Sequence, residues 1–278
     1  MVKKSVPFIG TDFILRCTFD ENIRLKLQFV KYHGTGNDFV IIDNRDGLIH
    51  LSTEEIQKVC SRRYGVGSDG LILIEHSDQA DFHMNFYNPD ASQSFCGNGS
   101  RCAVHCALQL GVEVKNHSFT AFDGLHAYSC ESNWVKVGMK VVGEVEPLGE
   151  DHFVNTGSPH YVKNAKDLES IDLIKEAHHI RYNDRFRSNG TNVNFINSME
   201  EGIKVRTYER GVEGETYSCG TGVTAVALVD RLINGGNHTR NIFTKGGELK
   251  VSFEQNSSEL LIWLEGQATF VFSGVWTC

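Results

Sequence analysis

The chain contains the pattern Cys-Gly-x-Gly twice, at residues 96–99 and 219–222. Each copy is followed directly by a run of small, helix-favouring residues, 100–108 and 223–228. The sequence therefore predicts two helices that each begin beside a cysteine. The first N–H groups of a helix have no helical partner and lie at the positive end of its macrodipole. We expect this position to lower the pKa of Cys96 and Cys219 and to stabilise a nearby anion.

Length and composition limit the class of protein. The 278 residues are 40% hydrophobic, which is enough for a sizeable core and suggests two domains of ordinary size or one large one. A net charge of −8 argues against a nucleic-acid-binding face, and no apolar run reaches membrane-spanning length. The first residues lack a secretory signal, so we expect a cytoplasmic protein. The eight cysteines include no CxxC pair, which favours reduced, mostly buried thiols over a disulfide framework.

Local patterns predict the remaining elements. Ser52 followed by Thr-Glu-Glu indicates a capped helix that runs to Arg62, and a polar helix is expected around residues 167–177. Apolar runs between turn residues predict strands at 29–33, 39–43, 71–75, 82–87, 118–122, 125–129, 134–142, 153–155, 193–196, 205–208, 249–253, 260–264 and 268–272.

The two halves of the chain resemble each other. In each, a strand that ends in tyrosine (Tyr87 or Tyr208) leads through a polar loop to Cys-Gly-x-Gly and a helix. The two cysteines are 219 − 96 = 123 residues apart, about one domain length. We infer an α+β fold of two pseudo-symmetric halves from an internal duplication, each a β-rich, barrel-like shell around a central helix.

Two other motifs are given structural interpretations. Residues 65–70 match GxGxxG but follow a helix and precede a strand, which reverses the order of a dinucleotide-binding turn and indicates a helix stop plus turn. Cys96, Cys102 and Cys106 with His105 do not form a closed tetrahedral set at zinc-finger spacing. We therefore expect no metal site there.

The pair of equivalent cysteines favours proton transfer at a carbon stereocentre. Inversion of an α-carbon requires a base on one face and an acid on the other, and thiols can serve as both near neutral pH. The carbanion formed beside a carboxylate has ene-diolate character, which two helix N-termini can stabilise. A cysteine hydrolase that uses one thiol with His160 is an alternative, but a single nucleophile needs no second copy.

At these residues the chain resembles the diaminopimelate epimerase family. The matching blocks are 33–39, 65–70, 86–90 with 96–99, 190–195, and 208–211 with 219–222. The resemblance runs from about Phe29 to the C-terminus. It implies an enzyme that interconverts LL- and meso-diaminopimelate without a cofactor, in lysine and cell-wall precursor biosynthesis, usually as a homodimer.

The resemblance also implies roles for individual residues. Cys96 and Cys219 would form the acid/base pair, and backbone N–H groups of Gly97, Asn98, Gly220 and Thr221 would hold the reacting carboxylate. The distal amino-acid end of the substrate would be bound by Asn37, Asn88, Asn192, Glu209 and Arg210. Ser158 stands where the family usually has Asn and is a shorter side chain, and His160 would support the site.

The family's final strand tends to return to the first half, which implies three segments. Residues 1–27 would be a peripheral extension, 28–138 plus 268–278 the half that carries Cys96, and 139–267 the half that carries Cys219. The loop from Glu209 to Cys219 is one residue longer than expected. Three alternatives remain: a proline or hydroxyproline racemase, the cysteine hydrolase, and a catalytically silent binding protein of this fold.

Overall fold

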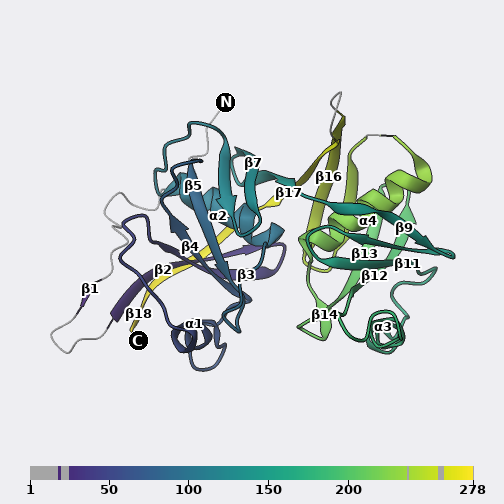
Figure 1. The fold of residues 1–278 in the computed structure, drawn as a ribbon, viewed down its shortest axis with the longest axis horizontal. Coiled ribbons are helices and arrows are strands. Elements are labelled where there is room, and N and C mark those ends of the chain that lie inside the picture. The colour runs from purple at the N-terminus through teal and green to yellow at the C-terminus, as the bar shows by residue number, and fades with distance from the viewer. Residues whose placement is uncertain (1–17, 20–24, 237, 256–259, 278) are drawn as a thin grey trace, which may run out of the picture.

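The computed structural model describes residues 18–19, 25–236, 238–255 and 260–277, and within these ranges no helix is long and apolar enough to cross a membrane. Two β-rich lobes lie side by side, each wrapped around one helix (Figure 1). Most of the proposed 1–27 extension lies outside the described residues. The first long strand already begins at Leu25.

The first lobe is built on helix α2 (Gly97–Gln109), with helix α1 (Thr53–Cys60) on its outer side. Its strands are β1 (Thr18–Phe19), β2 (Leu25–Gly34), β3 (Asn37–Asp43), β4 (Gly70–Glu75), β5 (Phe82–Tyr87), β6 (Ser118–Ala121), β7 (Gly124–Glu131) and β8 (Trp134–Met139). The last strand of the chain, β18 (Thr269–Thr277), pairs with β2.

The second lobe is built on helix α4 (Gly220–Asn234), with helix α3 (Leu173–Arg181) outside. Its strands are β9 (Val142–Leu148), β10 (Asp151–Asn155), β11 (Pro159–Asn164), β12 (Asn192–Met199), β13 (Gly202–Glu209), β14 (Gly214–Thr216), β15 (Arg240–Thr244), β16 (Gly247–Gln255) and β17 (Leu260–Gln267). Antiparallel pairing of β17 with β8 joins the lobes.

The two lobes repeat the same order of strand pairings. From β2 to β8 the successive pairs are antiparallel, parallel, antiparallel, parallel, antiparallel and antiparallel. From β10 through β11, β12, β13, β15 and β16 to β17 the order is identical. The helices fall at equivalent crossovers: α1 and α3 in the first parallel connection, α2 and α4 in the second. The predicted α+β fold with two pseudo-symmetric halves is confirmed.

Apolar packing follows the same repeat. Buried residues of α2, among them Cys102 and Cys106, form a core with the inner faces of the first lobe's strands. In the second lobe, the buried residues of α4 from Val223 to Val229, except Thr224, form a core with the inner faces of the strands. The outer helices α1 and α3 cover two further cores on the other side of the strands. Each central helix is therefore packed inside its own lobe along most of its length, and the two N-termini meet between the lobes.

Several local predictions are confirmed. Ser52 caps α1 in a capping box with Glu55, although α1 ends at Cys60 rather than Arg62, and residues 65–69 form a turn that precedes β4. The six described cysteines, 60, 96, 102, 106, 130 and 219, are unpaired.

Other local predictions are wrong. The polar helix begins at Leu173 rather than near Asp167, because Asp172 accepts the capping bond from Lys175 N. The run 134–142 is two strands that belong to different lobes, β8 and β9.

Candidate active site

Both cysteines are the N-cap residues of the central helices. Their backbones are nearly identical, with φ −130° and ψ 109° at Cys96 and φ −125° and ψ 111° at Cys219. This extended conformation is the ordinary one for an N-cap. Cys96 Sγ accepts a hydrogen bond of 3.4 Å from Gly99 N, which ties the sulfur to the helix end.

The two helix N-termini meet at their first glycines. A Cβ built on Gly97 would lie 3.6 Å from Gly220 Cα, and one built on Gly220 would lie 3.3 Å from Asn98 N. Both would also press on Leu264 Cδ2, at 2.9 and 3.0 Å. Glycine is therefore required for this approach, and it brings Cys96 and Cys219 to one place between the lobes.

The expected lowering of the thiol pKa values is wrong for this structure. Burial raises the pKa of Cys96 to about 11, although hydrogen bonding from Gly99 N–H acts in the opposite direction. Burial also raises the pKa of Cys219, and the negative charge of Glu209 adds to the effect at both thiols. The helix termini stabilise a thiolate, but loss of water from the site outweighs them, and the pKa of each thiol is raised.

Asn37 and Asn98 surround Cys96. Asn37 Nδ2 donates to Asp69 Oδ2 at 2.8 Å, which turns Asn37 Oδ1 toward the sulfur, 3.9 Å away. The same oxygen accepts from Asn98 Nδ2 at 3.2 Å. Asn98 Nδ2 also donates to Ser218 O at 3.1 Å, so one amide of α2 links Asn37 at the start of β3 to the loop that precedes α4.

Cys219 is held by a directed chain of side chains. Asn194 Nδ2 lies 3.1 Å from His160 Nδ1 and donates to it, which leaves the proton of the imidazole on Nε2. His160 Nε2 lies 2.9 Å from Thr221 Oγ1, and Thr221 Oγ1 lies 3.4 Å from Cys219 Sγ. Burial lowers the pKa of His160 to about 3, so the ring is neutral. Thr221 receives one hydrogen bond and is left free to donate its own proton to the sulfur.

Asn192 is hydrogen-bonded to two other predicted residues. Its Nδ2 donates to Ser158 Oγ at 3.1 Å, and its Oδ1 accepts from Arg210 N at 2.8 Å. The side chain of Arg210 is exposed and donates to Asn189 O at 2.7 Å. Glu209 is half-buried, and burial raises the pKa of its carboxyl.

Asn88 is the predicted residue that the structure ties least to the others. Its Nδ2 donates within its own loop, to Ser92 and to Ser94 Oγ at 3.1 Å. A substrate contact by Asn88 stays a prediction.

Three residues that link the lobes were missed. Thr35, in the turn between β2 and β3, donates from Oγ1 to Ser218 Oγ at 2.9 Å, across 183 positions of sequence. Arg101, on α2, is fully buried and donates to Thr35 Oγ1 at 3.3 Å. The sequence signal was their position: Thr35 lies inside a matching block, and Ser218 and Arg101 flank the two cysteine motifs.

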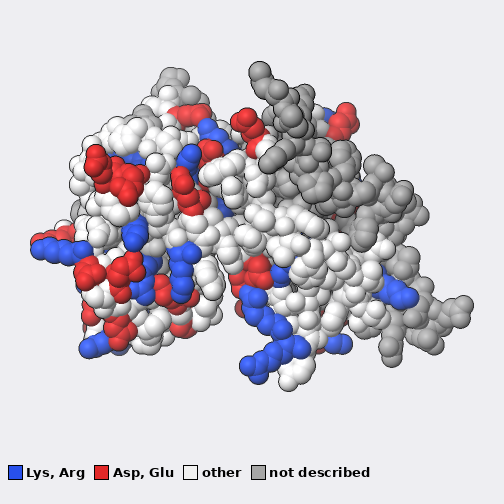
Figure 2. Space-filling view, turned by 180° about the vertical axis from the view of Figure 1, so that it is seen from behind, with Lys and Arg blue, Asp and Glu red and all other residues white. Residues whose placement is uncertain are grey.

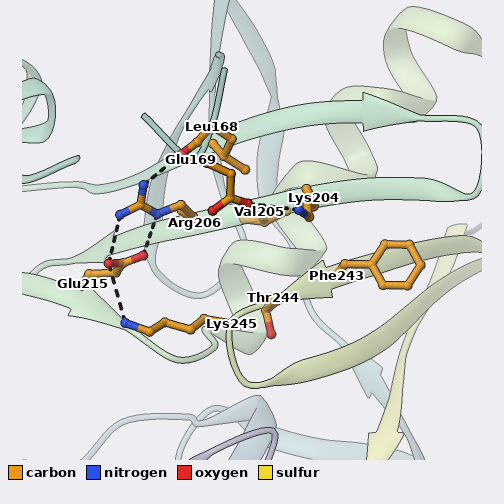
Figure 3. A pocket seen from close by; sticks show the side chains of 9 residues that line it. All are labelled: Leu168, Glu169, Lys204, Val205, Arg206, Glu215, Phe243, Thr244 and Lys245. Atoms are coloured by element: carbon orange, nitrogen blue, oxygen red, sulfur yellow. Dashed lines mark hydrogen bonds and ion pairs between the residues drawn. The ribbon is translucent and has the colours of Figure 1, made fainter. Parts of the chain in front are cut away.

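A separate hollow lies beside β13, between the part of that strand that pairs with β14 and the part that pairs with β15. Its volume is about 340 Å³, and its charged side chains are paired with each other, Arg206 with Glu215 and Lys204 with Glu169 (Figure 3). None of the predicted site residues lines it. The lining is Leu168, Glu169, Lys204, Val205, Arg206, Glu215, Phe243, Thr244 and Lys245. On the face shown in Figure 2, acidic and basic side chains are intermixed.

The contact between the helix ends makes a prediction about stability. Gly220→Ala places a methyl group against Asn98 N and should lower the free energy of unfolding by about 1–3 kcal/mol through overpacking. The matched control is Gly214→Ala, where the nearest atom would be 3.9 Å away, and it should change stability by less than about 0.5 kcal/mol. Urea unfolding measures both. Because alanine otherwise favours a helix over glycine, an equal or higher stability of Gly220→Ala would contradict the close contact.

Comparison with solved structures shows the fold. A PhzF-family phenazine biosynthesis protein of Bacillus anthracis is similar with a TM-score of 0.69 and 14% identity, over 90% of this chain and 98% of that one. A hydroxyproline epimerase of Agrobacterium vitis is similar with a TM-score of 0.66 and 12% identity, over 91% of each chain.

Comparison of sequences shows the family. The chain is 45% identical to a diaminopimelate epimerase of Flavobacterium psychrophilum, over 88% of this chain and 98% of that protein. It is 39% identical to a diaminopimelate epimerase of Aquifex aeolicus, over 89% and 97%. The diaminopimelate epimerase family model matches residues 29–140 and 152–271. With its paired cysteine caps and its duplicated fold, this chain belongs to the diaminopimelate epimerase family.

Proposed function

We propose that this chain is an isomerase that inverts one α-carbon of LL-diaminopimelate to give the meso isomer, with Cys96 and Cys219 as acid and base. The observation that carries the proposal is the meeting of two cysteine-capped helix ends at Gly97 and Gly220. A carbon held between them has a sulfur on each face. The relatives named diaminopimelate epimerase match this chain over nearly their whole length.

The reaction needs one thiolate and one thiol. The thiolate takes the α-proton, electrons move into the adjacent carboxylate, and the opposite thiol then gives its proton to the other face of the carbon. At the end of a turnover the two sulfurs have exchanged protonation states, and no other reactant is consumed. Because burial raises both thiol pKa values, positive charge near the sulfurs is needed to favour the thiolate. The α-ammonium group of the substrate adds to that charge when the substrate binds.

The developing negative charge lies on the substrate carboxylate. Gly97 and Asn98 begin α2, and Gly220 and Thr221 begin α4, so their N–H groups are at positions without a helical acceptor. We assign these four groups to the carboxylate. They are fixed before the reaction, which is the condition for strong stabilisation of an ene-diolate.

The distal amino-acid end would lie against Asn37, Asn88, Asn192, Glu209 and Arg210. Support comes from the hydrogen bonds that join Asn192 to Arg210 and to Ser158, and from the charge of Glu209, which acts on both thiols. A carboxylate and a guanidinium together match the ammonium and carboxylate of a second amino-acid end.

The cysteine hydrolase is less favoured by the geometry. His160 bonds to Thr221 and Asn194 rather than to either sulfur, and its lowered pKa makes it a weak base. We assign it to orientation of Thr221 and, through Thr221, of Cys219.

We further propose a cytoplasmic homodimer, with lobe boundaries at residues 138 and 268. The exposed apolar side chains of β18, the strand that pairs with β2, support the dimer. They are Phe270, Val271, Phe272 and Val275. The pairing of β18 with β2 supports the second boundary.

The substrate is tested by isotope exchange. Incubation of the enzyme with LL-diaminopimelate in deuterated water should introduce deuterium at one α-carbon, because the returned proton comes from a solvent-exchanged thiol. NMR follows the loss of the α-proton signal and the appearance of the meso isomer. Absence of exchange would refute the proposal, and exchange with proline or hydroxyproline alone would indicate a racemase of that type.

The two-thiol scheme is tested by substitution. Cys96→Ala and Cys219→Ala should each lower kcat by at least about 100-fold, the usual contribution of a general acid or base. Cys130→Ala, on β7 away from the helix ends, is the control and should keep near-native turnover. A near-native rate in either active-site variant would leave a single-base mechanism as the explanation.

A further inference from the structure

Arg101 is a buried charge for which the described part of the chain provides no anionic partner. It follows Cys96 by five residues on α2, and its side chain has no exposed surface. Its Nη1 lies 3.5 Å from Gly97 O and its Nη2 lies 3.3 Å from Thr35 Oγ1, and both are long contacts. Its Nε has no hydrogen-bond partner. Among the ion pairs of the described residues, none includes Arg101.

The chain makes room for this guanidinium on two sides. A Cβ on Gly34 would lie 3.0 Å from Nη2, and a Cβ on Gly266 would lie 3.3 Å from Nε. These glycines belong to β2 and to β17, on the two sides of the junction between the lobes. Burial of an unpaired guanidinium is costly, and a hydrophobic side chain of similar volume would avoid that cost. The position therefore calls for a reason other than stability.

Of the two thiols that the reaction uses, Cys96 is the one whose pKa the charge of Arg101 affects. The positive charge of Arg101 lowers the pKa of the Cys96 thiol, against the larger effect of burial. Burial lowers the pKa of Arg101 itself to about 10, which still leaves it charged at neutral pH. Its Nη1 contacts the carbonyl of Gly97, whose own N–H faces the proposed carboxylate site.

We propose that Arg101 is a positioning residue for this reaction: its buried guanidinium is the counter-charge for the anion that forms at the N-terminus of α2. It acts first on the Cys96 thiolate and then on the ene-diolate, and it touches neither the substrate nor the reacting atoms. This role rests on the proposed function, in which one thiol must ionise for turnover.

The contacts of Arg101 also connect it to the second thiol. Its Nη2 donates to Thr35 Oγ1, and Thr35 donates to Ser218 Oγ, which immediately precedes Cys219. Thr35 has a φ of 51°, a strained conformation for a β-branched residue that its packing must maintain. The guanidinium is thus linked to the first residue of α2 and, through Thr35, to the loop before α4, which places it near both helix ends.

The test compares a charged with an uncharged side chain at position 101. Arg101→Met removes the charge at similar volume, Arg101→Gln removes it but keeps a donor, and Arg101→Lys keeps it. Arg240→Met is the matched control, because Arg240 is also buried but pairs with Asp230 at 2.9 Å in the second lobe. Alkylation of Cys96 by iodoacetamide, followed peptide by peptide in the absence of substrate, reports the thiolate directly.

The expected result is a shift of the Cys96 reactivity profile. The groups whose charges act on Cys96 are Glu209 and Arg101, and those that act on Arg101 are Cys96 and Cys102. Without the guanidinium the midpoint of alkylation should move up by about one pH unit, with a rate about tenfold lower near pH 8. In Arg101→Met and Arg101→Gln, kcat should fall by at least about tenfold, with little change in KM. Arg101→Lys should keep the midpoint, and Arg240→Met should lose stability without any shift.

A folded Arg101→Met or Arg101→Gln protein with an unchanged midpoint would overturn the role of Arg101. If Arg101→Met does not fold, the midpoint of Cys96 alkylation in Arg101→Gln alone decides the question. Because alkylation uses no substrate, this outcome is independent of the exchange experiment with diaminopimelate. Failure of the proposed substrate and failure of the Arg101 role are therefore distinguishable.

Discussion

The structure depends on the contact between Gly97 and Gly220, where the first turns of α2 and α4 meet. Two helices that point their N-termini at each other bring together two positive dipole ends, which repel unless an anion lies between them. The buried guanidinium of Arg101 adds to the same field, and the described residues place one carboxylate, Glu209, close enough to affect both thiols. The site therefore favours an anion, and the protein's own groups provide only part of the negative charge. A substrate carboxylate that gains charge during the reaction meets that requirement.

The duplication explains the symmetry of the two cysteines, and the side chains around them explain how they differ. Both are N-caps with almost the same backbone angles. Cys96 is held by Gly99 N–H and faces the Asn37 amide, whereas Cys219 faces the Thr221 hydroxyl with His160 behind it. An epimerase substrate keeps a second, fixed stereocentre, so the two faces of its reacting carbon are not equivalent. Different surroundings for the two thiols suit that task better than strict symmetry.

Features that depend on neighbouring residues in the chain could be predicted from the sequence. The cysteine caps, the two central helices, the Ser52 capping box and the repeat of the halves all belong to this class. The start of α3 was misplaced because Asp167 and Asp172 can each accept a capping bond three residues later, and packing against β12 and β13 decides between them. The direction of the thiol pKa shift was missed because the helix dipole is visible in the sequence and burial is not. The Thr35–Ser218 bond joins residues 183 positions apart, and only the meeting of the lobes creates it.

The central claim is that the sulfurs of Cys96 and Cys219 face each other across the space of one carbon atom. Oxidative cross-linking tests it most directly, because a disulfide forms only between cysteines whose Cα atoms lie within about 7 Å or can reach that separation with little movement. Treatment with a mild oxidant, followed by peptide mapping, should give a Cys96–Cys219 disulfide with loss of activity that a dithiol reductant restores. Substrate added before the oxidant should slow the formation of this disulfide. Oxidation that gives no disulfide between Cys96 and Cys219, or that leaves activity intact, would contradict the account.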